Sequence, residues 1–133
     1  MAVTRRGEYE CLVERSRRFY ETALMQIGRG FYDLAAFSLE QSLQLYLRAC
    51  LLKLGLDYPR TRSVRRLLEL VYEVTGSEEV RDVLSRFSVE LGSLEDAYIT
   101  SRYVARDYSP EEVERLSVEV QRERGVYGGE AGA

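Results

Sequence analysis

The segment YDLAAFSLEQSLQLYLRACLLKL, residues 32–54, is the feature of the sequence that most constrains the fold. Its apolar residues recur at steps of three and four, which predicts a helix. Additional leucines widen the apolar stripe until it covers most sides of that helix. A helix that is apolar on most sides must pack against several neighbours, so we expect this one to be the central helix of a bundle.

Helical patterns also occur before and after this segment. Amphipathic spacing predicts helices over about residues 9–27, 64–74, 78–98 with a break or a bend at Gly92, and 110–120. Residues that commonly cap helices mark the ends of these helices. The GRG at residues 28–30, Gly55 and Gly76 are expected to end helices. Thr61 or Ser63, Ser77 and Ser109 are expected to start them. The sequence therefore predicts an all-α, up-and-down bundle of about five helices, in a single domain (1–133) with a flexible tail at 125–133.

Length and composition fit this fold and exclude several classes of function. The 133 residues, 45% apolar and 31% charged, suffice for one hydrophobic core. A net charge of −3 argues against a globally basic nucleic-acid binder, so no DNA partner is expected. No apolar run approaches the roughly 20 residues of a membrane span, and no signal peptide is recognisable. We expect a cytoplasmic protein.

The absence of histidine narrows the chemistry further. Ser-His and Cys-His catalysis are excluded, and the commonest acid/base at neutral pH is missing. Cys11 and Cys50 are far apart and are predicted to be reduced and structural, and no cluster of metal ligands is evident. No P-loop or Rossmann glycine motif is present. We therefore predict no catalytic residue, no metal and no cofactor.

The basic residues are almost all arginines. Eighteen arginines stand against one lysine, Lys53, and asparagine is absent. This composition suits a thermophilic source, in which thermolabile side chains are scarce, or a GC-rich genome.

A polar stripe runs along the most apolar helix. Glu40, Gln44 and Arg48 follow one another at steps of four residues, with Gln41 beside them. One interpretation is a solvent-exposed face with a ladder of side-chain contacts. The other is the polar wall of a groove between helices, where bundles commonly build their binding sites.

Four arginines lie within seven residues of the stretch DYPRTRSVRRLLEL, residues 57–70. Arg65 and Arg66 precede Glu69 at salt-bridge spacing, which predicts a solvated face with ion pairs. Arg60 and Arg62 fall in the loop and cap region, and they are the better candidates for contacts with phosphate.

The stretch AYITSRYVARDYSPEE, residues 97–112, combines tyrosines with arginines. Aromatic rings stack on bases and guanidinium groups grip phosphate, so this stretch suits a nucleotide. Tyrosines at helix interfaces and arginines paired with Asp96 or Asp107 would explain it equally well. Arg102 and Tyr103 are its candidate ligand contacts.

Together these stretches resemble the HEPN domain (higher eukaryotes and prokaryotes nucleotide-binding), and look closest to its small stand-alone archaeal and bacterial members. The family pattern reads roughly A-x-x-x-x-E-Q-A-x-x-x-x-x-K-A-L-L, then G-x-x-x-P-R-T-H-S-x-x-x-L-L, then A-Y-x-x-x-R-Y. The resemblance covers about residues 10–122, and the matching residues are Glu40, Gln41, Ala49, Leu51, Pro59, Arg60, Thr61, Ser63, Leu67, Leu68, Ala97, Tyr98, Arg102 and Tyr103.

The resemblance implies a bundle of the nucleotidyltransferase substrate-binding-subunit type, commonly dimeric and linked to nucleotides such as ATP. HEPN proteins are often encoded beside a minimal nucleotidyltransferase, in two-gene modules of toxin–antitoxin type. Many are metal-independent RNases with an R-x4–6-H motif. Here Arg62 stands in place of the histidine of P-R-T-H, Arg48 replaces the lysine of K-A-L-L, and Val104 replaces a proline that often follows R-Y.

We therefore expect a non-catalytic HEPN-type protein that binds a nucleotide or phosphate ligand, or a nucleotidyltransferase partner, in a cleft between helices. We also expect a homodimer. The alternatives are a degenerate RNase with weak activity and a plain oligomerisation module. In the leading hypothesis arginines contact phosphate, Tyr103 stacks on the base and Glu40 holds one arginine; the ligand-binding set is Glu40, Gln41, Arg48, Arg60, Arg62, Arg102 and Tyr103.

Overall fold

The computed structural model describes residues 4–57, 59–86, 88–89, 91–92 and 108–132. Its labelled helices are α1 (Arg5–Gly28), α2 (Tyr32–Lys53), α3 (Val64–Thr75), α4 (Glu78–Arg86) and α6 (Pro110–Gly132). The described ranges contain no strand. The predicted all-α bundle of about five helices is therefore confirmed. None of the helices in these ranges combines the length and the apolar character needed to cross a membrane.

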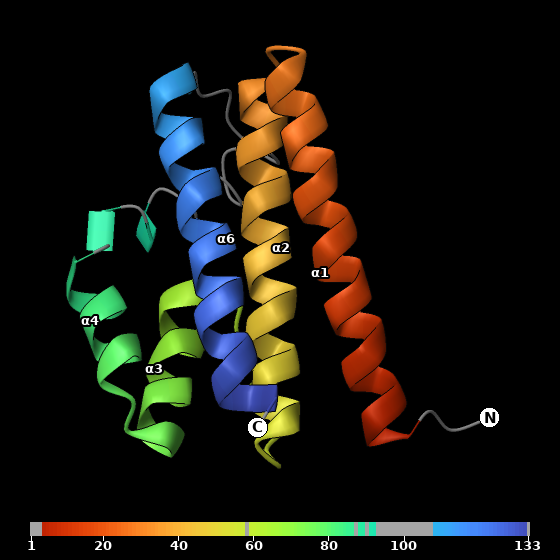
Figure 1. Cartoon of the computed structure of the whole chain (residues 1–133), viewed down its shortest axis with the longest axis vertical. Coiled ribbons are helices and arrows are strands. Elements are labelled where there is room, and N and C mark those ends of the chain that lie inside the picture. The colour runs from red at the N-terminus through yellow and green to blue at the C-terminus, as the bar shows by residue number, and fades with distance from the viewer. Residues whose placement is uncertain (1–3, 58, 87, 90, 93–107, 133) are drawn as a thin grey trace.

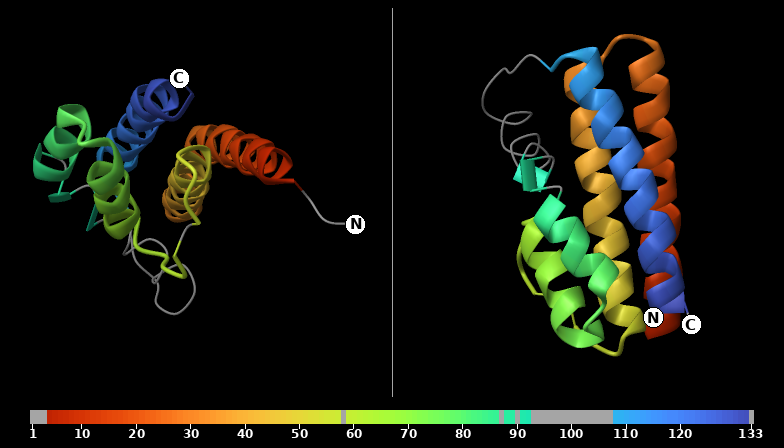
Figure 2. Two further views of the ribbon diagram at one scale, coloured as in Figure 1. Left: turned by 90° about the horizontal axis from the view of Figure 1, so that it is seen from below. Right: turned by 60° about the vertical axis from the view of Figure 1, so that its left-hand side comes forward.

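Three long helices lie side by side and form the body of the bundle (Figure 1). The chain runs up α1 and returns down α2, and α6 runs in the same direction as α2. The shorter α3 and α4 form an antiparallel pair beside the lower half of the bundle, as the right-hand view in Figure 2 also shows. This arrangement places α2 in contact with α1, α3 and α6.

The helix ends follow the predicted caps. Gly30, Gly55 and Gly76 have positive φ angles of 77°, 88° and 62°, the left-handed conformation in which glycine ends helices without strain. The Ser63 hydroxyl accepts a hydrogen bond from the Arg66 amide at 3.2 Å and so begins α3. Ser109 accepts from the Glu112 amide at 3.1 Å and begins α6. Helix α6 extends to Gly132, through the segment predicted to be a tail; its flexibility stays a prediction.

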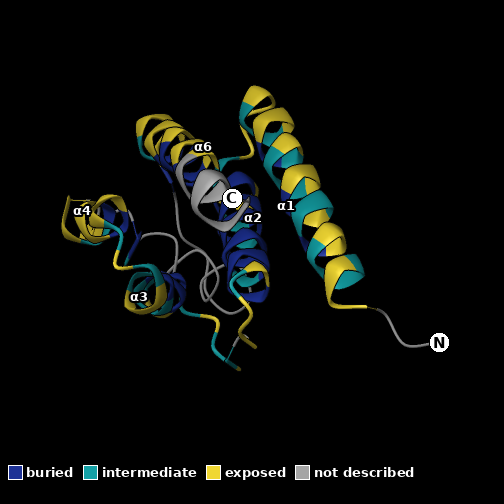
Figure 3. Ribbon diagram, turned by 60° about the horizontal axis from the view of Figure 1, so that its bottom comes forward, coloured by how far each residue is buried: buried dark blue, intermediate teal, exposed yellow. Residues whose placement is uncertain are grey.

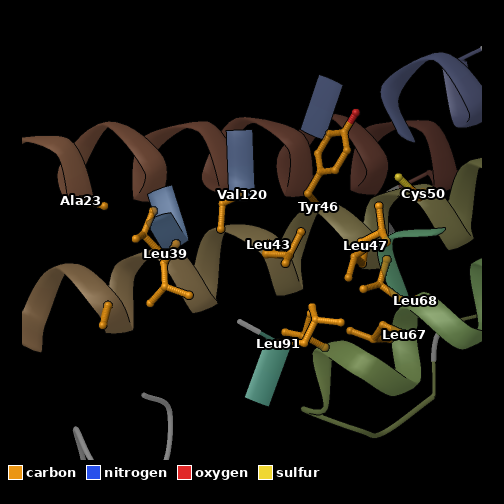
Figure 4. Close-up of a cluster of buried hydrophobic side chains, with 14 of the residues drawn as sticks. Ala23, Leu39, Leu43, Tyr46, Leu47, Cys50, Leu67, Leu68, Leu91 and Val120 are labelled. Atoms are coloured by element: carbon orange, nitrogen blue, oxygen red, sulfur yellow. The ribbon is translucent and has the colours of Figure 1, made fainter. Parts of the chain in front are cut away.

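The core is built around α2, which is dark blue along most of its length in Figure 3. Leu39, Leu43 and Leu47 are fully buried on one side of this helix. Figure 4 shows leucines of α3 approaching them from one direction and Val120 of α6 from another. A second cluster covers the side of α2 towards α1 and consists of Leu12, Leu45, Ala49 and Leu52. Burial on both sides confirms the central position predicted for residues 32–54.

Two buried serines fix α1 against α2. The Ser16 hydroxyl donates to the Ser42 carbonyl at 2.6 Å, and the Ser42 hydroxyl donates to the Ser16 carbonyl at 2.8 Å. The exchange satisfies both hydroxyls inside the core, where an unpaired polar group would be costly. These two bonds hold α2 against α1 at Ser42, two residues after Glu40. Glu40 is the first residue of the polar stripe.

Candidate functional site

The connection between α2 and α3, residues 54–63, folds back along α2. Gly55 supplies the left-handed turn at its start. Arg5 of α1 then donates to the Leu56 carbonyl at 2.9 Å and to the Asp57 carboxylate at 3.0 Å. Further on, the connection passes beside the polar stripe of α2: Gln44 Nε2 donates to the Arg62 carbonyl at 3.0 Å and Arg48 Nη2 donates to the Thr61 carbonyl at 3.3 Å.

These bonds hold an arginine-bearing loop over the helix that carries Arg48. The described residues that line the resulting cleft, of about 300 Å³, are Arg48, Pro59, Arg60 and Arg62. The side chains of Arg60 and Arg62 are exposed, and Arg48 is half-buried. A neighbouring carboxylate, Asp57, is already paired with Arg5 at 3.0 Å. The cleft is therefore locally positive although the chain as a whole carries −3.

Glu40 is fully buried behind this cleft. Its carboxylate accepts hydrogen bonds from Gln41 Nε2 at 2.7 Å and from Gln44 Nε2 at 2.8 Å. Burial raises the pKa of Glu40 to about 7, because a charged carboxylate is poorly solvated there. The two amide hydrogen bonds and the positive charges of Arg62 and Arg48 oppose this rise in the pKa without cancelling it.

The solvent-face interpretation of the polar stripe is wrong. Glu40 and Gln44 are both fully buried, so they cannot form a ladder on the protein surface. Glu40 and Gln44 instead lie behind the cleft, and Arg48, the last residue of the stripe, lines it. The physical reason is the backtracking connection, which covers this face of α2 and brings backbone carbonyls to the polar side chains.

The structure brings most of the predicted site residues together. Arg48, Arg60 and Arg62 line one cleft. Glu40 lies behind it and Gln41 donates to Glu40. Arg102 and Tyr103, the remaining two, lie outside the described residues.

Two residues of this site were absent from the predicted ligand-binding set. The sequence pattern places Gln44 in the polar stripe without a role in the site. In the structure its side-chain amide joins Glu40 to the loop that carries Arg62. Pro59 lines the cleft. The four-residue spacing from Glu40 was the available signal for Gln44, and the P-R-T match was the signal for Pro59.

The other two arginines of the 57–70 stretch have structural contacts. Arg66 pairs with Glu69 at 3.2 Å, as its spacing predicts, and also with Glu73 at 3.4 Å, which was not predicted. Arg65 donates to the Ser88 carbonyl at 2.9 Å, a contact with the segment after α4 that the spacing did not predict. Arg65 and Arg66 thus make structural contacts, whereas Arg60 and Arg62 line the cleft.

This geometry suits anion binding better than proton transfer. Guanidinium groups stay charged at all relevant pH values and grip phosphate through paired hydrogen bonds, which makes them poor acids or bases. Glu40 titrates near neutrality but has no exposed surface from which to reach a substrate. No group of three or more acidic, cysteine or histidine side chains is placed to hold a metal ion in the part of the chain that the structure describes. Cys11 and Cys50 do not form a disulfide with each other.

A second, smaller cleft lies on α1. Its described lining is Arg15, Arg18, Phe19 and Thr22, around about 240 Å³. Arg18 is already engaged with Glu14 at 3.3 Å. The described lining of this cleft thus contains two arginines, against three in the cleft beside α2.

Comparisons with known proteins agree with the observed fold. The sequence matches the model of the HEPN domain over residues 9–122. A search of curated proteins found no matching sequence.

Proposed function

The chain belongs to the HEPN domain family, and on that basis we propose that it binds a nucleotide or another phosphate-bearing ligand, without catalysis, in the cleft beside α2. The observation that carries this proposal is the convergence of Arg48, Arg60 and Arg62 on one cleft. Guanidinium groups in such a cluster match the charge and the hydrogen-bonding geometry of phosphate oxygens.

The cleft fits the phosphate part of a nucleotide better than its base. Three of the four residues in its described lining are arginines, whose guanidinium groups recognise phosphate oxygens. Phosphates would therefore supply most of the binding energy, and the ligand would be selected mainly by its charge.

The absence of histidine supports a binding role over an enzymatic one. The alternative of a degenerate RNase needs a group that takes a proton from the ribose 2′-hydroxyl, and arginine is poorly suited to that task. Cleavage of RNA by the purified protein, lost on Arg62→Ala, would favour the alternative. A minimal nucleotidyltransferase partner in a toxin–antitoxin module, and a homodimer, stay predictions from the family resemblance.

Calorimetric titration with ATP, ADP, AMP and adenosine tests the proposal. We expect affinity to fall about tenfold or more with each phosphate removed, because a charge-assisted hydrogen bond contributes about 1.5–3 kcal/mol. Adenosine should show no binding, and the affinity for ATP should fall steeply as salt is added. Equal binding of adenosine and ATP, or no heat with any of the four, would refute the phosphate site.

A further inference from the structure

We infer that binding of an anion in the cleft beside α2 takes up a proton on Glu40, so that ligand and proton bind together. This inference rests on the proposed function, because it concerns the same cleft and its ligand. It differs from that function in its claim that a buried group without access to the ligand responds to binding.

A continuous set of contacts joins Glu40 to the cleft. Gln44 Nε2 donates to Glu40 at 2.8 Å and to the Arg62 carbonyl at 3.0 Å, so one amide touches both the carboxyl and the loop. Arg48, two helical turns after Glu40, lines the cleft and donates to the Thr61 carbonyl at 3.3 Å. Glu40 therefore lies behind the arginines that would hold the ligand.

The ionised form of Glu40 depends on those same arginines. Burial is the largest influence on this carboxyl and favours its neutral form. The opposing influences are the amides of Gln41 and Gln44, which do not titrate, and the positive charges of Arg62 on the connection and Arg48 on α2. Two of the four groups that stabilise the carboxylate are thus groups that line the cleft.

An anion between Arg48 and Arg62 would cancel part of the positive field that acts on Glu40. The amide bonds would remain, but burial would then be opposed by less positive charge, so the neutral carboxyl would become the favoured form. The pKa of Glu40 is about 7 without ligand, so charged and neutral molecules are both present near neutral pH. The charged molecules would take up a proton when the anion binds.

Linkage fixes the direction of the pH dependence. A ligand that takes up protons binds more weakly as the pH rises, by at most about tenfold per pH unit for one proton. Between pH 6.5 and 8.5 we expect the affinity of the wild type, divided by that of Glu40→Gln, to fall about three- to tenfold. Protonation of ATP itself affects both proteins alike and cancels in this ratio.

The test is calorimetric titration of ATP into the full chain at pH 7.5, in two buffers with different heats of ionisation. The wild type should take up about 0.3–0.5 proton more than Glu40→Gln. Glu114→Gln removes an exposed carboxylate on α6 and serves as the matched control. Its proton uptake on ATP binding should equal that of the wild type. Equal uptake in the wild type and Glu40→Gln would overturn this inference alone, whereas no heat with ATP in the wild type would overturn the proposed function as well.

A second measurement needs no substitution at Glu40. The carboxyl ¹³C signal of Glu40 can be followed against pH in the wild type, with and without saturating ATP. We expect the midpoint to move upward when ATP is bound. An unchanged midpoint, in a protein that demonstrably binds ATP, would overturn the inference.

Discussion

Replacing Glu123 with methionine should stabilise the protein by about 2–4 kcal/mol at pH 8. Glu123 lies on α6 and is fully buried, and neither of its carboxylate oxygens has a hydrogen-bond partner among the described residues. Burial raises its pKa well above the ordinary value, and the charge of the neighbouring Glu119 raises it further against the opposing effect of Arg122. Methionine has a similar length and no charge to bury, so it removes this cost.

The gain should depend on pH in a defined direction. Because the pKa of Glu123 is raised in the folded state, the folded protein holds a proton that the unfolded chain releases above about pH 4.3. Below that pH both states are protonated, so the penalty from proton release disappears and only the cost of burying an unpaired neutral carboxyl remains. As the pH rises from there, the unfolded state is increasingly favoured until the folded carboxyl also ionises.

Urea unfolding of the wild type and Glu123→Met at pH 4, 6 and 8 measures this effect. The stability difference should be smallest at pH 4 and grow towards pH 8. Glu114→Met, on the exposed face of the same helix, is the matched control and should change stability little at any pH. A gain that is constant across pH, or a loss of stability at pH 8, would contradict the burial of an unpaired carboxyl.

The double variant Arg60→Ala, Arg62→Ala should weaken ATP binding by about 100-fold or more. Each substitution removes a guanidinium group from the cleft, and each charge-assisted contact contributes about 1.5–3 kcal/mol. Arg60→Lys should lie between the wild type and Arg60→Ala, because an ammonium keeps the charge but loses the planar fork. Calorimetry at fixed ionic strength measures each affinity.

The control for this prediction removes one arginine outside the cleft and is compared with Arg60→Ala, which removes one arginine within it. Arg81→Ala removes an exposed arginine on α4 and should leave the affinity for ATP unchanged. Circular dichroism should show the same helix content in all variants, since Arg60 and Arg62 are exposed. An equal loss in the Arg81 variant would indicate a general effect of net charge, which would refute a local phosphate site.

Helix starts and ends were predictable because they depend on local chemistry. Ser63 and Ser109 cap helices through bonds to amides three residues away, and Gly76 ends α3 with a φ angle of 62°. Such interactions need only the few residues around them. The choice between Thr61 and Ser63 as the cap of α3 needed the structure: Ser63 caps the helix, while the Thr61 hydroxyl accepts from the Ser63 amide at 3.1 Å.

The covering of a helix face was harder to predict. Periodicity identified Glu40, Gln44 and Arg48 as one stripe, but could not say whether water or protein lies over it. The answer depends on the path of residues 54–63, which is a tertiary property. The burial of Glu119 and Glu123 was missed for a related reason, since charged residues are seldom fully buried.

The most direct test of the phosphate site is an NMR titration that follows the arginine Nε–Hε signals as ATP is added. The cleft beside α2 predicts that the signals of Arg48, Arg60 and Arg62 shift together and saturate at one concentration of ATP. The signals of Arg15 and Arg18, which line the cleft on α1, should not shift. Shifts confined to Arg15 and Arg18, or no shift at any arginine, would contradict the account.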